Sequence, residues 1–130
     1  MQTRRTALAL AILTLPLLAI TSRAGEKQAF TRKAFAEAQQ AGKSILVDIR
    51  ASWCSTCKTQ AHIIDKIFAE PKYKDIVIFD VDFDSQKDVV RSLRAQTQST
   101  LIGFKGATET GRSVGDTDPL AIEDLIEKAL

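Results

Sequence analysis

The chain has 130 residues, of which 45% are hydrophobic and 26% charged, with two cysteines, one histidine and one tryptophan. This length fits one compact domain and is too short for two separate cores. The formal charge of +2 is uneven: residues 1–24 hold three arginines and no acidic residue, which leaves 15 basic and 16 acidic residues in the rest of the chain. That part lacks the positive surplus that phosphate neutralisation requires, so we expect no nucleic-acid partner.

The first segment has the pattern of a secretory signal peptide. Two arginines precede the apolar residues 7–20, and small residues stand three and one positions before a cleavage point after Ala24. A membrane anchor is the alternative, but 14 positions that include a proline fall short of the about 20 apolar residues that span a bilayer. We therefore expect residues 1–24 to be removed on export, residues 25–130 to form the mature domain, and the protein to reside in the periplasm.

The periodicity of apolar residues predicts alternating helices and strands in the rest of the chain. In chain order we expect a helix capped by Thr31 and ended by Gly42, a buried strand over residues 45–49, a helix from near Cys54 to Phe68, a buried strand over residues 76–79, a helix capped by Ser85 that carries Val89, Val90 and Leu93, a strand over residues 101–104, a short strand around residues 112–114, and a helix opened by Asp118 and Pro119. This order is typical of a layered α/β domain.

The two cysteines, Cys54 and Cys57, are better suited to redox chemistry than to structure or metal binding. A loop this short constrains the unfolded chain too little for the disulfide to stabilise the fold much. A zinc site normally has four ligands, and the other soft ligand, His62, would be rotated by about 140° from Cys57 on a helix. We therefore expect no metal and no cofactor, and a metallochaperone is the less favoured alternative.

The predicted elements place Cys54 between a buried strand and the N-terminus of a helix. Unpaired amide groups and the helix dipole favour a thiolate there, and the thiolate is the attacking species. Cys57, one turn further along, is close enough to attack a mixed disulfide formed at Cys54. Between them, the hydroxyls of Ser55 and Thr56 either donate to the thiolate, which favours the reduced form, or face water.

A known family has the same pattern. The sequences Ile45-Leu46-Val47-Asp48 and Trp53-Cys54-Ser55-Thr56-Cys57-Lys58 resemble the active-site segment of the thioredoxin family, and the resemblance continues through residues 99–106 and Val114-Gly115. It spans nearly all of residues 25–130. The resemblance implies a three-layer α/β fold, with a mixed sheet of four or five strands flanked by helices, and thiol–disulfide exchange with protein substrates.

The resemblance also implies roles for individual residues. Cys54 matches the family's nucleophile, Cys57 its resolving cysteine, Asp48 its buried carboxylate and Trp53 the neighbouring aromatic residue, which we expect to contact substrate. Independently of the family, a carboxylate in an apolar strand should have a raised pKa, and Asp48 could then take the proton of the Cys57 thiol. The alternative is that Asp48 ends its strand and faces solvent.

Four features depart from the family pattern: the Ser55-Thr56 pair, His62 at the position of a helix-kinking proline, Asp80 and Ser99. Ser99 stands at the position of the family's cis-proline, which faces the cysteines and lends backbone to the bound substrate. A cis bond before serine is costly, so we expect a trans bond between Gln98 and Ser99, a shifted or looser loop over residues 96–99, and a Ser99 hydroxyl that approaches Cys54. Asp80 stands where the family has a lysine; it either points inward beside Asp48, which would raise a pKa further, or is a polar strand end.

These observations favour a monomeric periplasmic thiol–disulfide oxidoreductase that acts on protein thiols and disulfides through a Cys-Ser-Thr-Cys redox pair, whether as reductase or oxidase. The main alternative is a non-catalytic binding module that keeps the fold as a scaffold. A reductant in an oxidising compartment needs an electron source. The segment Ala51-Ser52-Trp53-Cys54 also resembles the C-terminal domain of the bacterial transmembrane thiol reductase, and a membrane-embedded thiol reductase is the candidate donor.

Overall fold

The structure is a computed structural model that describes residues 26–130, so the expected signal peptide lies outside the described residues. The described elements, in chain order, are β1 (Glu26–Ala29), α1 (Arg32–Gln40), β2 (Ser44–Arg50), α2 (Ser55–Phe68), the 3-10 helix η1 (Pro71–Tyr73), β3 (Val77–Asp82), α3 (Lys87–Ser92), β4 (Thr100–Lys105), β5 (Thr108–Val114) and α4 (Pro119–Glu127). No helix within residues 26–130 has the length and apolar character needed to cross a bilayer.

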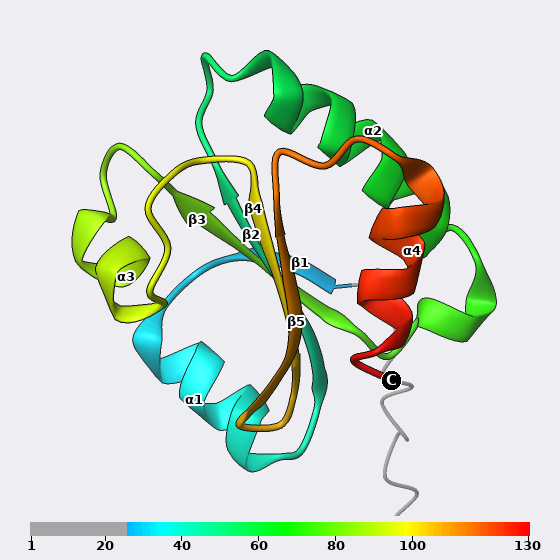
Figure 1. Cartoon of the computed structure of the whole chain (residues 1–130). Helices are drawn as coiled ribbons and strands as arrows, with labels where there is room; N and C mark the ends of the chain where they lie inside the picture. The colour runs from blue at the N-terminus through cyan, green and yellow to red at the C-terminus, as the bar shows by residue number, and fades with distance from the viewer. Residues whose placement is uncertain (1–25) are drawn as a thin grey trace, which may run out of the picture.

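The five strands form one mixed sheet in the order β1-β3-β2-β4-β5 (Figure 1). β1, β3 and β2 run parallel, whereas β4 and β5 are antiparallel to their neighbours. At the centre of the sheet, Asp48 of β2 lies between Asp80 of β3 and Leu101 of β4. The predicted mixed sheet flanked by helices is confirmed.

Helices cover both faces of this sheet and complete the three layers (Figure 1). α1 and α3 pack on one face over a cluster that includes Val47 and Phe79, and α2 and α4 pack on the other over a cluster that includes Leu46 and Leu101. Successive side chains of a strand point to opposite faces, which explains why the continuous apolar run of β2 feeds both clusters.

Local signals at the ends of α1 and at the start of α4 act as the sequence predicts. The Thr31 hydroxyl accepts from the Ala34 amide at 3.1 Å at the start of α1, and Gly42 takes a left-handed conformation (φ 67°) after it ends. Asp118 caps α4 by accepting from the Leu120 amide at 3.0 Å, with Pro119 in the first turn.

The structure differs from the sequence expectations in three places. β1 was not expected, because its sequence Glu-Lys-Gln-Ala has no apolar alternation; it adds to β3 as an edge strand. Ser85 does not cap α3: its hydroxyl donates to Asp82 at 2.7 Å, and Gln86 is the N-cap residue. β5 begins earlier than expected, at Thr108, because it pairs with β4 along its length.

Candidate active site

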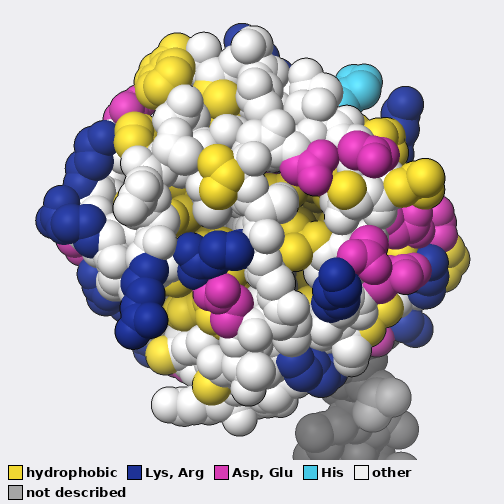
Figure 2. All heavy atoms as spheres, in the orientation of Figure 1, with side chains coloured by type: hydrophobic (Ala, Val, Ile, Leu, Met, Phe, Trp, Pro, Cys, Tyr) yellow, Lys and Arg dark blue, Asp and Glu magenta, His cyan; other side chains and the backbone are white. Residues whose placement is uncertain are grey.

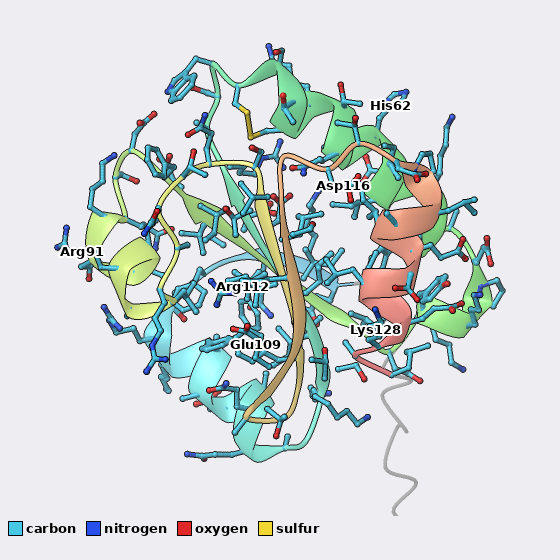
Figure 3. The ribbon with its side chains drawn as sticks, viewed as in Figure 1. His62, Arg91, Glu109, Arg112, Asp116 and Lys128 are labelled. Atoms are coloured by element: carbon cyan, nitrogen blue, oxygen red, sulfur yellow. A yellow bond between two sulfur atoms is a disulfide. The ribbon has the colours of Figure 1, made fainter. Side chains whose placement is uncertain are left out.

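Cys54 and Cys57 form a disulfide at the N-terminus of α2, just beyond the end of β2 (Figure 3). The Cys54 amide donates to the Ala51 carbonyl at 3.2 Å, which closes the turn between the two elements. The Cys54 sulfur is itself the N-cap group of α2 and accepts from the Cys57 amide at 3.1 Å. The predicted placement of Cys54 between a buried strand and a helix N-terminus is confirmed.

This placement makes the two sulfurs chemically unequal. The amide donor and the positive end of the helix dipole act on the Cys54 sulfur, so they stabilise negative charge there when the disulfide is opened. Both cysteines are buried, at 5% and 2% exposed, so the position of Cys54 at the helix N-terminus, and not its exposure, distinguishes the two sulfurs. Within the described chain, neither hydroxyl between them donates to the Cys54 sulfur, and Ser55 is exposed.

Asp48 lies buried on the face of the sheet that α2 covers. It is 1% exposed, and neither of its carboxyl oxygens has a hydrogen-bond partner among residues 26–130. By the alternation of side chains it shares this face with Leu46, which packs in one cluster with Ile64 of α2. Burial, with repulsion from Asp80 as the second cause, raises the pKa of Asp48 to about 6. The alternative of an aspartate that faces solvent is therefore wrong.

Asp80 also points toward this buried region and is not simply a polar strand end. Its side chain is 28% exposed, and its Oδ1 is buried without a hydrogen-bond partner in the described chain. Burial raises the pKa of Asp80, against the opposing charges of Lys27 and Arg50. The Arg50 guanidinium lies 3.8 Å from the other Asp80 oxygen, and Lys27 pairs with Asp65 of α2 at 3.7 Å. Two carboxyl groups thus share one region that has two cations at its edge.

Trp53 is 60% exposed immediately before Cys54. Its indole Nε1 donates to Asp84 Oδ2 at 2.8 Å, which ties the residue to the loop after β3. From the same loop, Phe83 packs against the cluster formed by Ala51 and the two cysteines, and the Lys87 ammonium lies 3.7 Å from the centre of its ring. The exposed ring of Trp53, held by its hydrogen bond to Asp84, therefore adjoins the disulfide.

The loop before β4 carries Gln98 and Ser99. All peptide bonds of residues 26–130 are trans, as expected for the bond between these two residues. Ser99 is 8% exposed and adopts the left-handed conformation, with φ 57°, which is uncommon for a residue other than glycine. Because Thr100 pairs with Ile49 near the end of β2, Ser99 lies at the end of the sheet that carries the disulfide.

Two details of this loop differ from expectation. The Ser99 hydroxyl donates to the Gln98 carbonyl at 2.6 Å, so its proton is not directed to Cys54. The loop is also not loose: the Thr97 hydroxyl donates to the Gln98 side chain at 2.8 Å, and the Thr100 hydroxyl donates to the Thr97 carbonyl at 2.8 Å. The looser loop is not found, because these hydroxyls bond to acceptors within the loop itself. A shift relative to the family's loop stays a prediction.

Gln60 of α2 is the residue of this region that sequence reasoning missed. It is fully buried, and its Nε2 donates to the carbonyls of Ser99 and Asp116 at 3.2 and 2.9 Å. A signal was present in the sequence, because an amide in the inward stripe of an otherwise apolar helix needs partners. The partners themselves could not be read from the sequence, since they are 39 and 56 residues away.

The remaining soft ligand, His62, is exposed on the outer surface of α2 (Figure 3). Within residues 26–130, no group of three or more histidine, cysteine, aspartate or glutamate side chains is arranged to hold a metal ion. Uncharged groups make up most of the upper part of the surface in Figure 2, while lysines and arginines lie on the left, in the centre and on the right. Near the disulfide, the exposed Trp53 adjoins the charged side chain of Asp84, and that of Lys87 lies over the Phe83 ring.

Comparison with known proteins gives consistent matches. The sequence model of the family described as Thioredoxin matches residues 26–128. Thioredoxin-2 of Saccharomyces cerevisiae is 39% identical over 84 residues, which cover 65% of this chain and 78% of that protein. A thioredoxin of Chlamydia trachomatis is 32% identical over 101 residues, which cover 78% of this chain and 96% of that protein.

A solved structure supports the same relationship. The crystal structure of Trxlp from Edwardsiella tarda EIB202 is similar, with a TM-score of 0.75 and 38% sequence identity. The match covers 78% of this chain and 98% of that one. The similarity therefore extends over almost the whole of that protein.

Proposed function

Because the chain belongs to the thioredoxin family and is a thiol–disulfide oxidoreductase with its disulfide between Cys54 and Cys57, we propose that it exchanges disulfides with exported proteins in the periplasm. The observation that carries this proposal is the Cys54 sulfur at the N-cap of α2, where an amide and the helix dipole favour its thiolate. The export pattern of residues 1–24 supports the compartment.

In the reducing direction, the Cys54 thiolate attacks one sulfur of the substrate disulfide. A bond forms between the two sulfurs, and the second substrate sulfur leaves as a thiolate, which takes a proton from solvent. Trp53, exposed beside Cys54, offers an apolar contact to the incoming protein.

The second step releases the substrate. The Asp48 carboxylate takes the proton of the Cys57 thiol, and the resulting thiolate attacks the Cys54 sulfur. The bond between Cys54 and Cys57 forms, and the bond to the substrate breaks. Two electrons have then passed from the cysteine pair to the substrate, and the same steps in reverse oxidise a substrate dithiol. For the next reducing cycle, a membrane-embedded thiol reductase is the proposed donor.

Substitution of each cysteine tests the chemistry directly. With dithiothreitol as reductant, Cys54→Ser should reduce insulin at the uncatalysed rate, because the attacking sulfur is gone. Cys57→Ser should accumulate a mixed disulfide with the substrate, visible on non-reducing gels, because the second step is blocked. Equal binding of partner proteins by the wild type and the doubly substituted variant, without disulfide exchange, would instead support a passive binding module.

Two further measurements test the direction and the compartment. Equilibration with glutathione gives the reduction potential: a value near about −270 mV indicates a reductant and a value near about −120 mV an oxidant. Expression of the full chain in a bacterial host should yield periplasmic protein whose mass lacks residues 1–24. Recovery of uncleaved protein from the cytoplasm would contradict the proposed compartment.

A further inference from the structure

Gln60 interrupts the apolar stripe of α2. The buried residues of this helix are Cys57, Gln60, Ile64, Ile67 and Phe68, a spacing that places them on one inward face. Gln60 is fully buried there, one turn beyond Cys57. Gln60 is therefore a polar side chain in the interface between α2 and the rest of the molecule.

The carboxamide of Gln60 joins α2 to two loops. Its Nε2 donates to the Ser99 carbonyl before β4 and to the Asp116 carbonyl in the connection between β5 and α4 (Asp116 is labelled in Figure 3). Both partners are acceptors, so the nitrogen of the amide must face them. The Ser99 carbonyl also accepts from the Gly115 amide at 2.8 Å, so three segments meet at this one atom.

Stability alone does not favour this arrangement. Gln60 Oε1 is buried without a hydrogen-bond partner among the described residues, which is unfavourable for a polar atom. Ser99 holds a left-handed backbone, which is unfavourable for a residue with a side chain. An apolar residue at position 60 would avoid the first of these costs. Two unfavourable features thus meet at the contact between Gln60 and Ser99.

The contact lies at the end of the molecule that carries the disulfide. Ser99 lies at the same end of the sheet as the turn that leads to Cys54, and Gln60 lies one turn beyond Cys57 on the inward face of α2. The bond between them therefore places the backbone of residues 97–99 beside the part of α2 that carries the cysteines. The Gln60 carboxamide sets where this backbone stands relative to α2.

We propose that Gln60 is a positioning residue for protein substrates: it holds the Ser99 peptide in its left-handed conformation and so fixes the loop over residues 97–99 beside the cysteines. This proposal rests on the proposed function. It predicts that loss of the amide weakens the handling of proteins, which contact the loop, and spares small disulfides, which need only the Cys54 sulfur.

The test compares two substrates of the reduced protein. For Gln60→Leu, which keeps the bulk and removes the donor, kcat/KM for insulin should fall about tenfold, mainly through a higher KM. The rate constant for the small disulfide dithiobis(nitrobenzoate) should change less than about twofold. Equal effects on both substrates, or no effect on insulin, would overturn the proposal.

Two further variants keep the result decisive. Tyr73→Phe removes a buried hydroxyl that bonds to Glu123 and Glu127 in α4; it serves as a control for general destabilisation and should leave both rates unchanged. If Gln60→Leu does not fold, Gln60→Met, which is more flexible, takes its place with the same expectation. A wild type inactive toward both substrates would instead refute the proposed function itself.

Discussion

The two faces of the sheet bury different kinds of side chain. The face under α1 and α3 holds a cluster of aromatic rings, Phe30, Phe35, Phe79 and Phe104, with centroids between 5.0 and 5.9 Å apart. The face under α2 and α4 is also largely apolar, but Asp48, Asp80 and Gln60 add buried polar atoms without partners in the described chain. The face under α1 and α3 therefore stabilises the fold, whereas the buried polar atoms under α2 and α4 lower stability on the face that carries the active site.

The largest expected effect tests the stabilising face. Phe79 is fully buried, and Phe79→Ala should lower the free energy of unfolding by about 3–5 kcal/mol through lost burial and a cavity. The reduction potential should not change, because the Phe79 ring packs on the face of the sheet opposite Asp48. Urea unfolding and equilibration with glutathione measure the two quantities.

A matched truncation on the other face sharpens this contrast. Leu101→Ala removes a fully buried side chain that neighbours Asp48 across the strands, with a stability loss of about 2–5 kcal/mol. Here the pKa of Asp48 should also fall toward its ordinary value, because truncation admits solvent. If the pKa of Asp48 does not change in Leu101→Ala, or if the reduction potential changes in Phe79→Ala, the two faces do not differ in this way.

The next effect concerns the stability cost of Asp48. Its pKa rises from 3.8 to about 6 in the folded protein, so the folded state holds this proton more tightly and stability falls as the pH rises through this range. Asp48→Asn should therefore stabilise the protein by about 2–3 kcal/mol at pH 8 and by almost nothing near pH 3.5. Asp75→Asn, at an exposed carboxylate, is the control and should show no such gain.

The same substitution should slow the release of substrate. Without a proton acceptor for Cys57, decay of the mixed disulfide near neutral pH should slow by about a hundredfold. The difference should shrink as the pH approaches the ordinary pKa of a thiol, because solvent hydroxide then replaces the carboxylate. Stopped-flow measurement between about pH 6 and 9 covers this range, and identical profiles would remove Asp48 from the second step.

The smallest effect belongs to Asp80. Because its charge is the second cause of the raised pKa of Asp48, after burial, Asp80→Asn should lower that pKa by less than burial raises it. Carbon-13 NMR of the Asp48 carboxyl group measures this shift. Arg50, which pairs with Asp80 at 3.8 Å, would then act on Asp48 without that competitor. A higher pKa of Asp48 in Asp80→Asn would contradict this prediction.

Most of the fold could be predicted from the sequence because its signals are local. Thr31, Asp118 and the apolar stripes mark helices through contacts within a few residues. β1 could not be predicted, because its backbone pairs with the edge of β3 and its own side chains show no strand pattern. Serine is a common N-cap residue, which is why Ser85 was the expected cap of α3. In the structure its hydroxyl instead donates to the carboxylate of Asp82.

The site divides in the same way. The cysteines and Asp48 could be found because a strand, a helix start and a short spacing place them together. The left-handed Ser99 and its bond to Gln60 could not, because a backbone conformation imposed from 39 residues away leaves no local pattern. A trans bond before Ser99 followed from general energetics, whereas the direction of its hydroxyl depended on which acceptor lay nearest.

Trp53 has a practical consequence for experiments on this protein. It is the chain's single tryptophan, it directly precedes Cys54, and its indole is anchored to Asp84. The chain also has one tyrosine, so excitation at wavelengths that only indole absorbs yields emission from this one position. We expect that emission to change when the adjacent bridge opens. Electron transfer can thus be followed in real time without an attached dye.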